Sequence, residues 1–388
     1  MGTIGKTEKR RKVDILTLVL VAGLLLFGLL MLLNIFSDRF DGTETTFVQF
    51  WERLNFEHFN RQLGNILVSL VVAIPIATLD YRRYRPFLKG AYFGVCLLLG
   101  LVLLIGENTR GMIGWFTVGT RAFQPSEVAK IALIGILSKT AADAVERRGK
   151  VVRFVDVLVP FLYFLVPFVL VLRQPDLGTA FVYLVIFVAI LFAAQLDWKY
   201  ILGGGLLAGA GLPVVYTLLN PAQKARILVF LFPAMNQETD GYNVLRAKEV
   251  IASGGVWGKG LFSPELLSQT GYVPERHNDF IFSGIAETQG LVGGLLLIVA
   301  FCVLLLRWMR IASNVKDPFG RCLVVGCVTL LGFHIFENIG MNMGLMPVTG
   351  IPLPFISYGG SNMLASLLAV CVVMSVYRKA DTGMLRAE

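Results

Sequence analysis

About ten apolar runs dominate this chain, and each is long enough to cross a lipid bilayer as a helix. A span needs about 20 apolar residues, because the hydrocarbon core is about 30 Å thick and a helix rises about 1.5 Å per residue. A hydrophobic content of 55% and a mean hydropathy of +0.69 agree with this pattern. We therefore expect an all-α, polytopic membrane protein that forms one domain over residues 1–388. The apolar runs lie at residues 13–36, 61–79, 87–106, 126–145, 155–172, 178–196, 200–219, 280–306, 322–344 and 362–377.

The positions of the basic residues predict the orientation in the membrane. If successive connections lie on alternate sides, most of the 35 Lys and Arg residues fall on the side of the N-terminus, and such residues concentrate in the cytoplasm. Both tails, residues 1–12 and 378–388, are therefore expected to be cytoplasmic. The first apolar run is too long for a signal peptide and is interpreted as an anchor. Because topology explains the net charge of +9, nucleic-acid binding is not inferred.

A large polar connection, residues 220–279, lies between the seventh and eighth runs and is predicted to be extracytoplasmic. It ends in Pro-Glu-Arg-His-Asn-Asp-Phe at residues 274–280. Connections of this length are usually functional or disordered, and the Gly, aromatic and apolar content of this one argues against disorder. We expect the chemistry to lie here.

Several common catalytic and metal-binding motifs are missing. Residues 254–260 are similar to a phosphate loop, but Ser253 stands where the loop requires its first Gly. The five cysteines lie in or beside apolar runs and form no CxxC pair, so neither an outer disulfide nor a zinc site is expected. A histidine-based metal site is not expected either, because the histidines are scattered, at His58, His277 and His334.

Polar residues at the outer ends of the runs are the remaining candidates. Glu127 and Lys130 are one helical turn apart, and this spacing is typical of an exposed ion pair or of a pair that lines a cavity at the lipid boundary. We favour the cavity. Asp176 is either a functional acid or the N-cap of the next helix. Residues 347–361 contain three Pro and three Gly, and such irregular backbone at membrane depth is expected to line a cavity.

Together these segments resemble the SEDS family (shape, elongation, division and sporulation), which includes the peptidoglycan glycosyltransferases RodA, FtsW and SpoVE. Departures from the family pattern, which include Asn278 for a usual Thr and Thr288 for a usual Glu, leave the subfamily open. The resemblance extends from the first run to Tyr377, and its most specific motifs are Phe123–Lys130, Gln174–Ala180, Ser253–Leu261, Pro274–Phe282 and Pro347–Ser361.

The resemblance implies polymerisation of lipid II, the undecaprenyl-pyrophosphate-linked disaccharide pentapeptide, at the outer face of the bacterial cytoplasmic membrane. It assigns Asp279 as the essential acid. It also implies a partner, a class B penicillin-binding protein that supplies the transpeptidase. Elongation, division and sporulation roles are not distinguished. The candidate substrate-binding residues are Glu127, Lys130, Asp176, Arg110, Arg121, Lys259, Glu275, His277 and Ser357.

The chemistry agrees with this assignment. A carboxylate within reach of a sugar hydroxyl can act as general base while pyrophosphate departs, and one displacement inverts the anomeric configuration. Asp279 fits this role, although it can also cap the following helix. The departing pyrophosphate needs positive charge. The basic candidates are Arg110, Arg121, Lys130, Arg226, Arg246, Lys259 and Arg276.

Two questions stay open at this stage. No organic cofactor is expected, but a divalent cation, Mg²⁺ or Mn²⁺, bridging Asp279 and pyrophosphate oxygens is compatible with the residues. The activity also has alternatives, because ten helices with intramembrane charges suit a flippase or transporter for the lipid-linked precursor. A non-catalytic scaffold for a transpeptidase is the third reading.

Overall fold

The computed structural model describes residues 13–38, 46–109, 112–119, 121–151, 153–218, 221–232 and 240–379. Each of the ten apolar runs coincides with one long helix. These are α1 (Ile15–Phe36), α3 (Glu57–Thr78), α4 (Leu88–Ile105), α5 (Pro125–Arg148), α6 (Phe154–Arg173), α7 (Leu177–Ala193), α8 (Trp198–Leu218), α11 (Ile281–Asn314), α12 (Pro318–Asn342) and α13 (Gly360–Lys379).

Within the described ranges, seven of these helices are long and apolar enough to cross a membrane, namely all except α5, α7 and α8. The expected all-α, multi-pass membrane architecture is therefore confirmed. The count of ten spans stays a prediction for those three helices.

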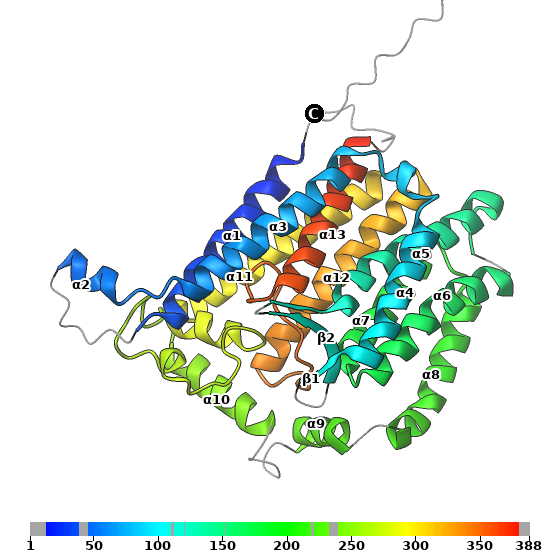
Figure 1. Cartoon of the computed structure of the whole chain (residues 1–388). Helices are drawn as coiled ribbons and strands as arrows, with labels where there is room; N and C mark the ends of the chain where they lie inside the picture. The colour runs from blue at the N-terminus through cyan, green and yellow to red at the C-terminus, as the bar shows by residue number, and fades with distance from the viewer. Residues whose placement is uncertain are drawn as a thin grey trace, which may run out of the picture.

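Helix α12 occupies the centre of the bundle. It contacts α5, α7, α11 and α13, and α13 in turn packs along α3 (Figure 1). The shared core contains Phe301, Trp308 and Phe319, each buried. Side chains on α12 can therefore reach several segments that are distant in sequence.

Ion pairs tie the helices together at the end predicted to be cytoplasmic. Arg307, near the end of α11, lies 2.8 Å from Asp14, which directly precedes α1. Arg85 pairs with Asp143 and Glu146 of α5, and it follows the short 3-10 helix η1 (Tyr81–Tyr84). Arg307 also lies 5.8 Å from the Tyr377 ring centroid, and Arg378 donates to the Ala77 carbonyl of α3 at 3.1 Å, so the beginning of α1 lies at the same end as the connection between α3 and α4.

The opposite end of the molecule carries most of the irregular structure. The short helix α2 (Phe47–Glu52) follows α1, and the connection 220–279 contains α9 (Pro221–Leu231), α10 (Asp240–Ser253) and the 3-10 helix η3 (Leu267–Thr270). Helices α9 and α10 lie at the end of the bundle away from the C-terminal end of α13 (Figure 1).

A small sheet, which the sequence did not lead us to expect, lies between α4 and α5. Strands β1 (Glu107–Thr109), β2 (Met112–Val118) and β3 (Arg121–Phe123) pair antiparallel in that order. Strands of three to seven residues give little periodic signal, so hydropathy does not predict them.

Helix α11 is interrupted at Gly290, and a loop forms hydrogen bonds with backbone groups of α11 next to the interruption. Gly290 has φ 65° and ψ −168°, a conformation that essentially only glycine adopts. The loop that follows α10 donates from the backbone amides of Lys259 and Gly260 to the carbonyls of Glu287 and Thr288 (3.0 Å each). It also accepts from the amide of Leu291 (2.9 Å) through the Gly255 carbonyl. This exchange satisfies groups that would be costly to leave unpaired at membrane depth.

We expect Gly290→Ala to destabilise the protein, because a Cβ at this position would lie 2.3 Å from the amide nitrogen of Gly258 and the residue would keep a positive φ. The backbone strain alone costs on the order of 1–3 kcal/mol. The measurement is the melting temperature in detergent. Gly100→Ala in α4, where a Cβ meets nothing within 4 Å, is the control. Equal melting temperatures for the two variants would contradict the proposed role of the loop in completing α11.

Candidate active site

Asp279 lies in the turn before α11, and two side-chain amides of α12 hold its backbone. Asn338 and Asn342 donate from Nδ2 to the Asp279 carbonyl oxygen at 2.8 and 2.9 Å. Asn338 also donates to the Ile351 carbonyl at 2.8 Å, and Asn342 Oδ1 accepts from the Ser283 amide at 3.1 Å. The position of Asp279 is thus set from the centre of the bundle.

The Asp279 side chain is half-buried and lies near Gly350 in the segment 347–359. Gly350 adopts φ 76°, and a Cβ built on it would lie 3.4 Å from Asp279 Oδ2. Ser357 Oγ donates to the Asn278 carbonyl at 2.7 Å and accepts from the Leu353 amide at 2.8 Å. Ser357, predicted to bind substrate, is buried and fixes the backbone next to Asp279.

The remaining residues of the Pro274–Phe280 motif support this turn. Glu275 Oε2 accepts from Asn278 Nδ2 at 2.9 Å. The His277 ring lies 6.2 Å from the His58 ring and 6.0 Å from the Tyr358 ring, in a small aromatic cluster. Burial lowers the pKa of the Arg276 guanidinium, which stays protonated at neutral pH.

Glu127 and Lys130 form a buried ion pair. Lys130 Nζ lies 2.6 Å from Glu127 Oε1, and both side chains are at most 5% exposed. The same ammonium group lies 3.0 Å from His334 Nε2 of α12. The exposed ion pair, which was the alternative reading of the sequence, is therefore excluded, and His334 is a polar partner that sequence analysis missed.

Asp176 is the N-cap of α7, as one of the two readings of the sequence predicted. Its Oδ1 accepts from the Thr179 amide at 2.9 Å. Its Oδ2 accepts from Gln124 Nε2 at 3.3 Å, and the Gln124 amide donates to Ser361 Oγ at 2.9 Å. Through Gln124, which lies between β3 and α5, Asp176 therefore connects the start of α7 to α13.

Two basic candidates have partners inside the protein. Lys259 Nζ lies 2.9 Å from Glu287 Oε1, and Glu287 is fully buried and accepts from the amides of Leu267 and Ser268 at 2.7 and 2.9 Å. Arg246 pairs with Glu249 at 3.0 Å and lies over an aromatic ring. Roles of these two cations in pyrophosphate binding stay predictions.

Two further basic candidates, Arg110 and Arg121, belong to the stretch of sequence that contains the small sheet. Arg110 lies outside the described residues, and Arg121 is described only by its backbone, at the start of β3. Their contribution to substrate binding also stays a prediction.

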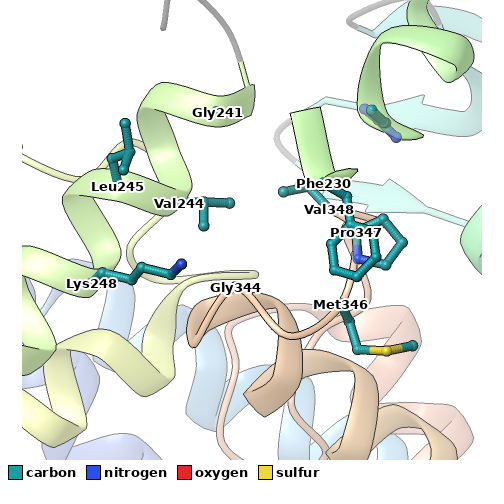
Figure 2. Close-up of a pocket in the computed structure, with 10 residues that line it drawn as sticks. Phe230, Gly241, Val244, Leu245, Lys248, Gly344, Met346, Pro347 and Val348 are labelled. Atoms are coloured by element: carbon teal, nitrogen blue, oxygen red, sulfur yellow. The ribbon is translucent and has the colours of Figure 1, made fainter. Parts of the chain in front are cut away.

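A pocket with basic and apolar walls lies beside the Asp279 turn. Its lining comes from α9, α10 and the turn after α12, and includes Arg226, Lys248 and Val348. Figure 2 shows Lys248 and Phe230 on elements that face each other across it. Val348 also belongs to a buried cluster with Phe280, the residue that follows Asp279. Val348 therefore connects the pocket lining to the cluster that contains Phe280.

Four polar residues of α12 form a continuous stripe, which we name the α12 polar face. Positions spaced by three, four and eight residues lie on one side of a helix. Polar residues at helical spacing within an apolar run were the signal that could have identified them, since such residues usually face the bundle interior. The α12 polar face consists of His334, Glu337, Asn338 and Asn342.

Comparison with known proteins agrees with this arrangement. The profile of the cell cycle protein family that groups FtsW, RodA and SpoVE matches residues 15–382. The chain belongs to this family. The resemblance described from the motifs is thus confirmed.

Members of the family with curated descriptions are similar over most of their length. The peptidoglycan glycosyltransferase MrdB of Escherichia coli K12 is 33% identical over 82% of this chain and 85% of its own. A protein named probable peptidoglycan glycosyltransferase FtsW from Geobacter metallireducens is 36% identical over 79% of this chain and 80% of its own.

Solved structures share the fold. A chain of a peptidoglycan synthase complex that coordinates polymerization and crosslinking superposes with a TM-score of 0.77 at 30% identity, over 94% of this chain and 98% of the other. The rod shape determining protein RodA of Thermus thermophilus superposes with a TM-score of 0.67 at 28% identity, over 95% and 98% of the two chains.

We expect Lys130→Met to be strongly destabilising, because it leaves the Glu127 carboxylate buried without its cation. Breaking a buried pair in this way costs about 3–5 kcal/mol. The double variant Glu127→Gln with Lys130→Met should recover part of the loss, as measured by melting temperature and by the monodisperse fraction in detergent.

The control removes an exposed pair of α3. Arg61→Met breaks a 2.6 Å contact with Glu57, whose side chain is 57% exposed, and should cost less than about 1 kcal/mol. Similar losses for Lys130→Met and Arg61→Met would contradict the burial argument.

Proposed function

We propose that this membrane glycosyltransferase of peptidoglycan synthesis polymerises lipid II at the outer face of the inner membrane, with Asp279 as general base. The observation that carries the proposal is the placement of Asp279, whose carbonyl is held by two amides of α12 while its half-buried carboxylate lies at the edge of the bundle's irregular end. Family membership and the names of the relatives support glycosyl transfer.

The proposed reaction has one proton acceptor and one leaving group. A hydroxyl of the acceptor sugar attacks the anomeric carbon of the donor, and its proton passes to the Asp279 carboxylate. A new carbon–oxygen bond joins the sugars, while the bond to undecaprenyl pyrophosphate breaks and its electron pair leaves with the pyrophosphate. A single displacement of an α-linked donor gives a β link, and no carboxylate nucleophile is required.

We assign basic residues near the Asp279 turn to binding of the pyrophosphate leaving group. Arg226 and Lys248 line the pocket near the Asp279 turn, and guanidinium and ammonium groups are suitable partners for pyrophosphate oxygens. In the same proposal Lys130, Arg110, Arg121 and Lys259 contribute positive potential, and Glu127, Asp176, Glu275, His277 and Ser357 shape the substrate site.

The outer orientation follows from charge and geometry together. The positive-inside pattern assigns the tails to the cytoplasm. Helices α9 and α10, which precede the Asp279 turn along the chain, lie at the opposite end from the end of α13 (Figure 1). We therefore assign the active site to the extracytoplasmic face.

A class B penicillin-binding protein is the proposed partner. The similar chain in a solved peptidoglycan synthase complex belongs to an assembly in which polymerization and crosslinking are coordinated. In the present proposal, this chain supplies polymerization and its partner supplies crosslinking.

A divalent cation, Mg²⁺ or Mn²⁺, enters the proposal only as an ion shared with the substrate. Among the described residues, no group of three or more His, Cys, Asp or Glu side chains could hold a metal. Asp279 would share the ion with pyrophosphate oxygens, which are ligands that hard cations prefer, and the ion would supply positive charge to the leaving group.

Asp279→Asn should lower the polymerisation rate by about 10²–10⁴-fold, the usual contribution of a general base, because the amide cannot accept the proton. The measurement is glycan length and rate with purified protein and labelled lipid II in detergent or liposomes. Asp38→Asn, an exposed substitution in the first outer connection, is the control and should keep the wild-type rate.

The same assay separates the alternative activities. Scrambling of lipid II across liposomes without polymer would indicate a flippase, and neither activity would indicate a scaffold. Full polymerisation by Asp279→Asn would overturn the assignment of the base.

If the cation is shared with the substrate, chelation with EDTA should reduce polymerisation by at least about tenfold, and added Mg²⁺ or Mn²⁺ should restore it. The melting temperature should stay unchanged on chelation, because no cluster of metal-ligating residues supports the fold within the described ranges. Unchanged rates in EDTA would indicate that Lys and Arg side chains alone neutralise the negative charge of the leaving pyrophosphate.

A further inference from the structure

Glu337 is a buried carboxylate that the proposed mechanism does not use. It lies on the α12 polar face, one turn after His334 and directly before Asn338, and is 1% exposed. Its Oε1 accepts a hydrogen bond from Thr349 Oγ1 at 2.9 Å. A single neutral hydroxyl offsets only part of the free-energy cost of burying a carboxylate. A contribution to stability therefore does not by itself account for a carboxylate at position 337.

The partner of Glu337 belongs to the turn that lies against Asp279. Thr349 directly precedes Gly350, where an added Cβ would lie 3.4 Å from Asp279 Oδ2. On the other side of Gly350, the Ile351 carbonyl accepts from Asn338 Nδ2 at 2.8 Å. Consecutive residues of α12 therefore hold the turn on both sides of Gly350.

The two anchors, Glu337 and Asn338, both hold backbone or side-chain groups around the Asp279 carboxylate. Asn338 holds the Asp279 backbone and residue 351, while Glu337 holds residue 349. Gly350, in a left-handed conformation at φ 76°, is thereby kept against Oδ2 of Asp279. A turn fixed at only one end could move away from the carboxylate and leave its side chain free to adopt other rotamers.

We propose that Glu337 is a positioning residue for glycosyl transfer, which acts through Thr349 and Gly350 to hold the Asp279 carboxylate in its reactive orientation. The inference rests on the proposed role of Asp279 as the base. Glu337 contacts neither sugar nor pyrophosphate in this scheme. Its effect is on the rate of the chemical step rather than on substrate affinity.

The test removes the hydrogen bond from each side. Thr349→Val and Glu337→Leu should lower kcat for lipid II polymerisation by about 10- to 100-fold, the usual cost of a small displacement of a catalytic group, with KM changed less than about threefold. The double variant should be no slower than the slower single variant, because both substitutions remove one interaction.

Conservative variants and a matched control separate positioning from folding. Glu337→Gln and Thr349→Ser keep an acceptor and a donor, and should stay within about threefold of the wild-type rate. Thr329→Val is the matched control. It makes the same Thr-to-Val change within α12, where the Thr329 hydroxyl donates to the Val325 carbonyl at 2.8 Å, and it should leave kcat unchanged. Rates are expressed per monodisperse, folded molecule, with melting temperatures measured in parallel.

The outcomes distinguish this inference from the assignment of the base. Wild-type kcat for Thr349→Val per folded molecule overturns the role of Glu337 even if Asp279→Asn is inactive. An equal defect in Glu337→Gln and Glu337→Leu also overturns it, because the retained hydrogen bond would then have no effect. Full activity of Asp279→Asn overturns the proposed base instead. If Glu337→Leu fails to fold, Thr349→Val carries the test by itself.

Discussion

The site depends on two carboxamides in the middle of a helix bundle. Asn338 and Asn342 both donate to the Asp279 carbonyl, at the edge of a lipid-embedded core. An unsatisfied backbone group in such surroundings costs several kcal/mol. Because the same amides also bond to Ile351 and Ser283, one helix determines where the segments before α11 and before α13 lie. The backbone of Asp279, the proposed base, is therefore held from the centre of the fold.

Much of the architecture could be predicted from the sequence, because lipid imposes a simple rule on the chain. Every apolar run became a helix, since a segment at membrane depth must satisfy its own backbone. The placement of Asp279 at the start of α11 followed from the point where the polar connection ends. For Asp176, the sequence offered a cap or a functional acid, and the structure contains the cap.

What could not be predicted depends on contacts between residues that are far apart in the sequence. Lys130 and His334 are 204 positions apart, and a single sequence does not reveal that α5 and α12 bring them together. Average hydropathy over α12 conceals its polar stripe, because four polar residues among many apolar ones leave the run hydrophobic. Gly290 is one of several glycines in α11, so its special conformation is not visible in the sequence.

The interruption at Gly290 also divides α11 into two parts that contact different regions of the protein. Residues 281–289 are linked to the loop after α10 through the Glu287 and Thr288 carbonyls and the Glu287 side chain, whereas the remainder of α11 continues toward the ion pair with Asp14. Residues 281–289 are therefore bonded to the connection 220–279, and Gly290 is the point that separates them from the part of α11 that packs among the apolar helices.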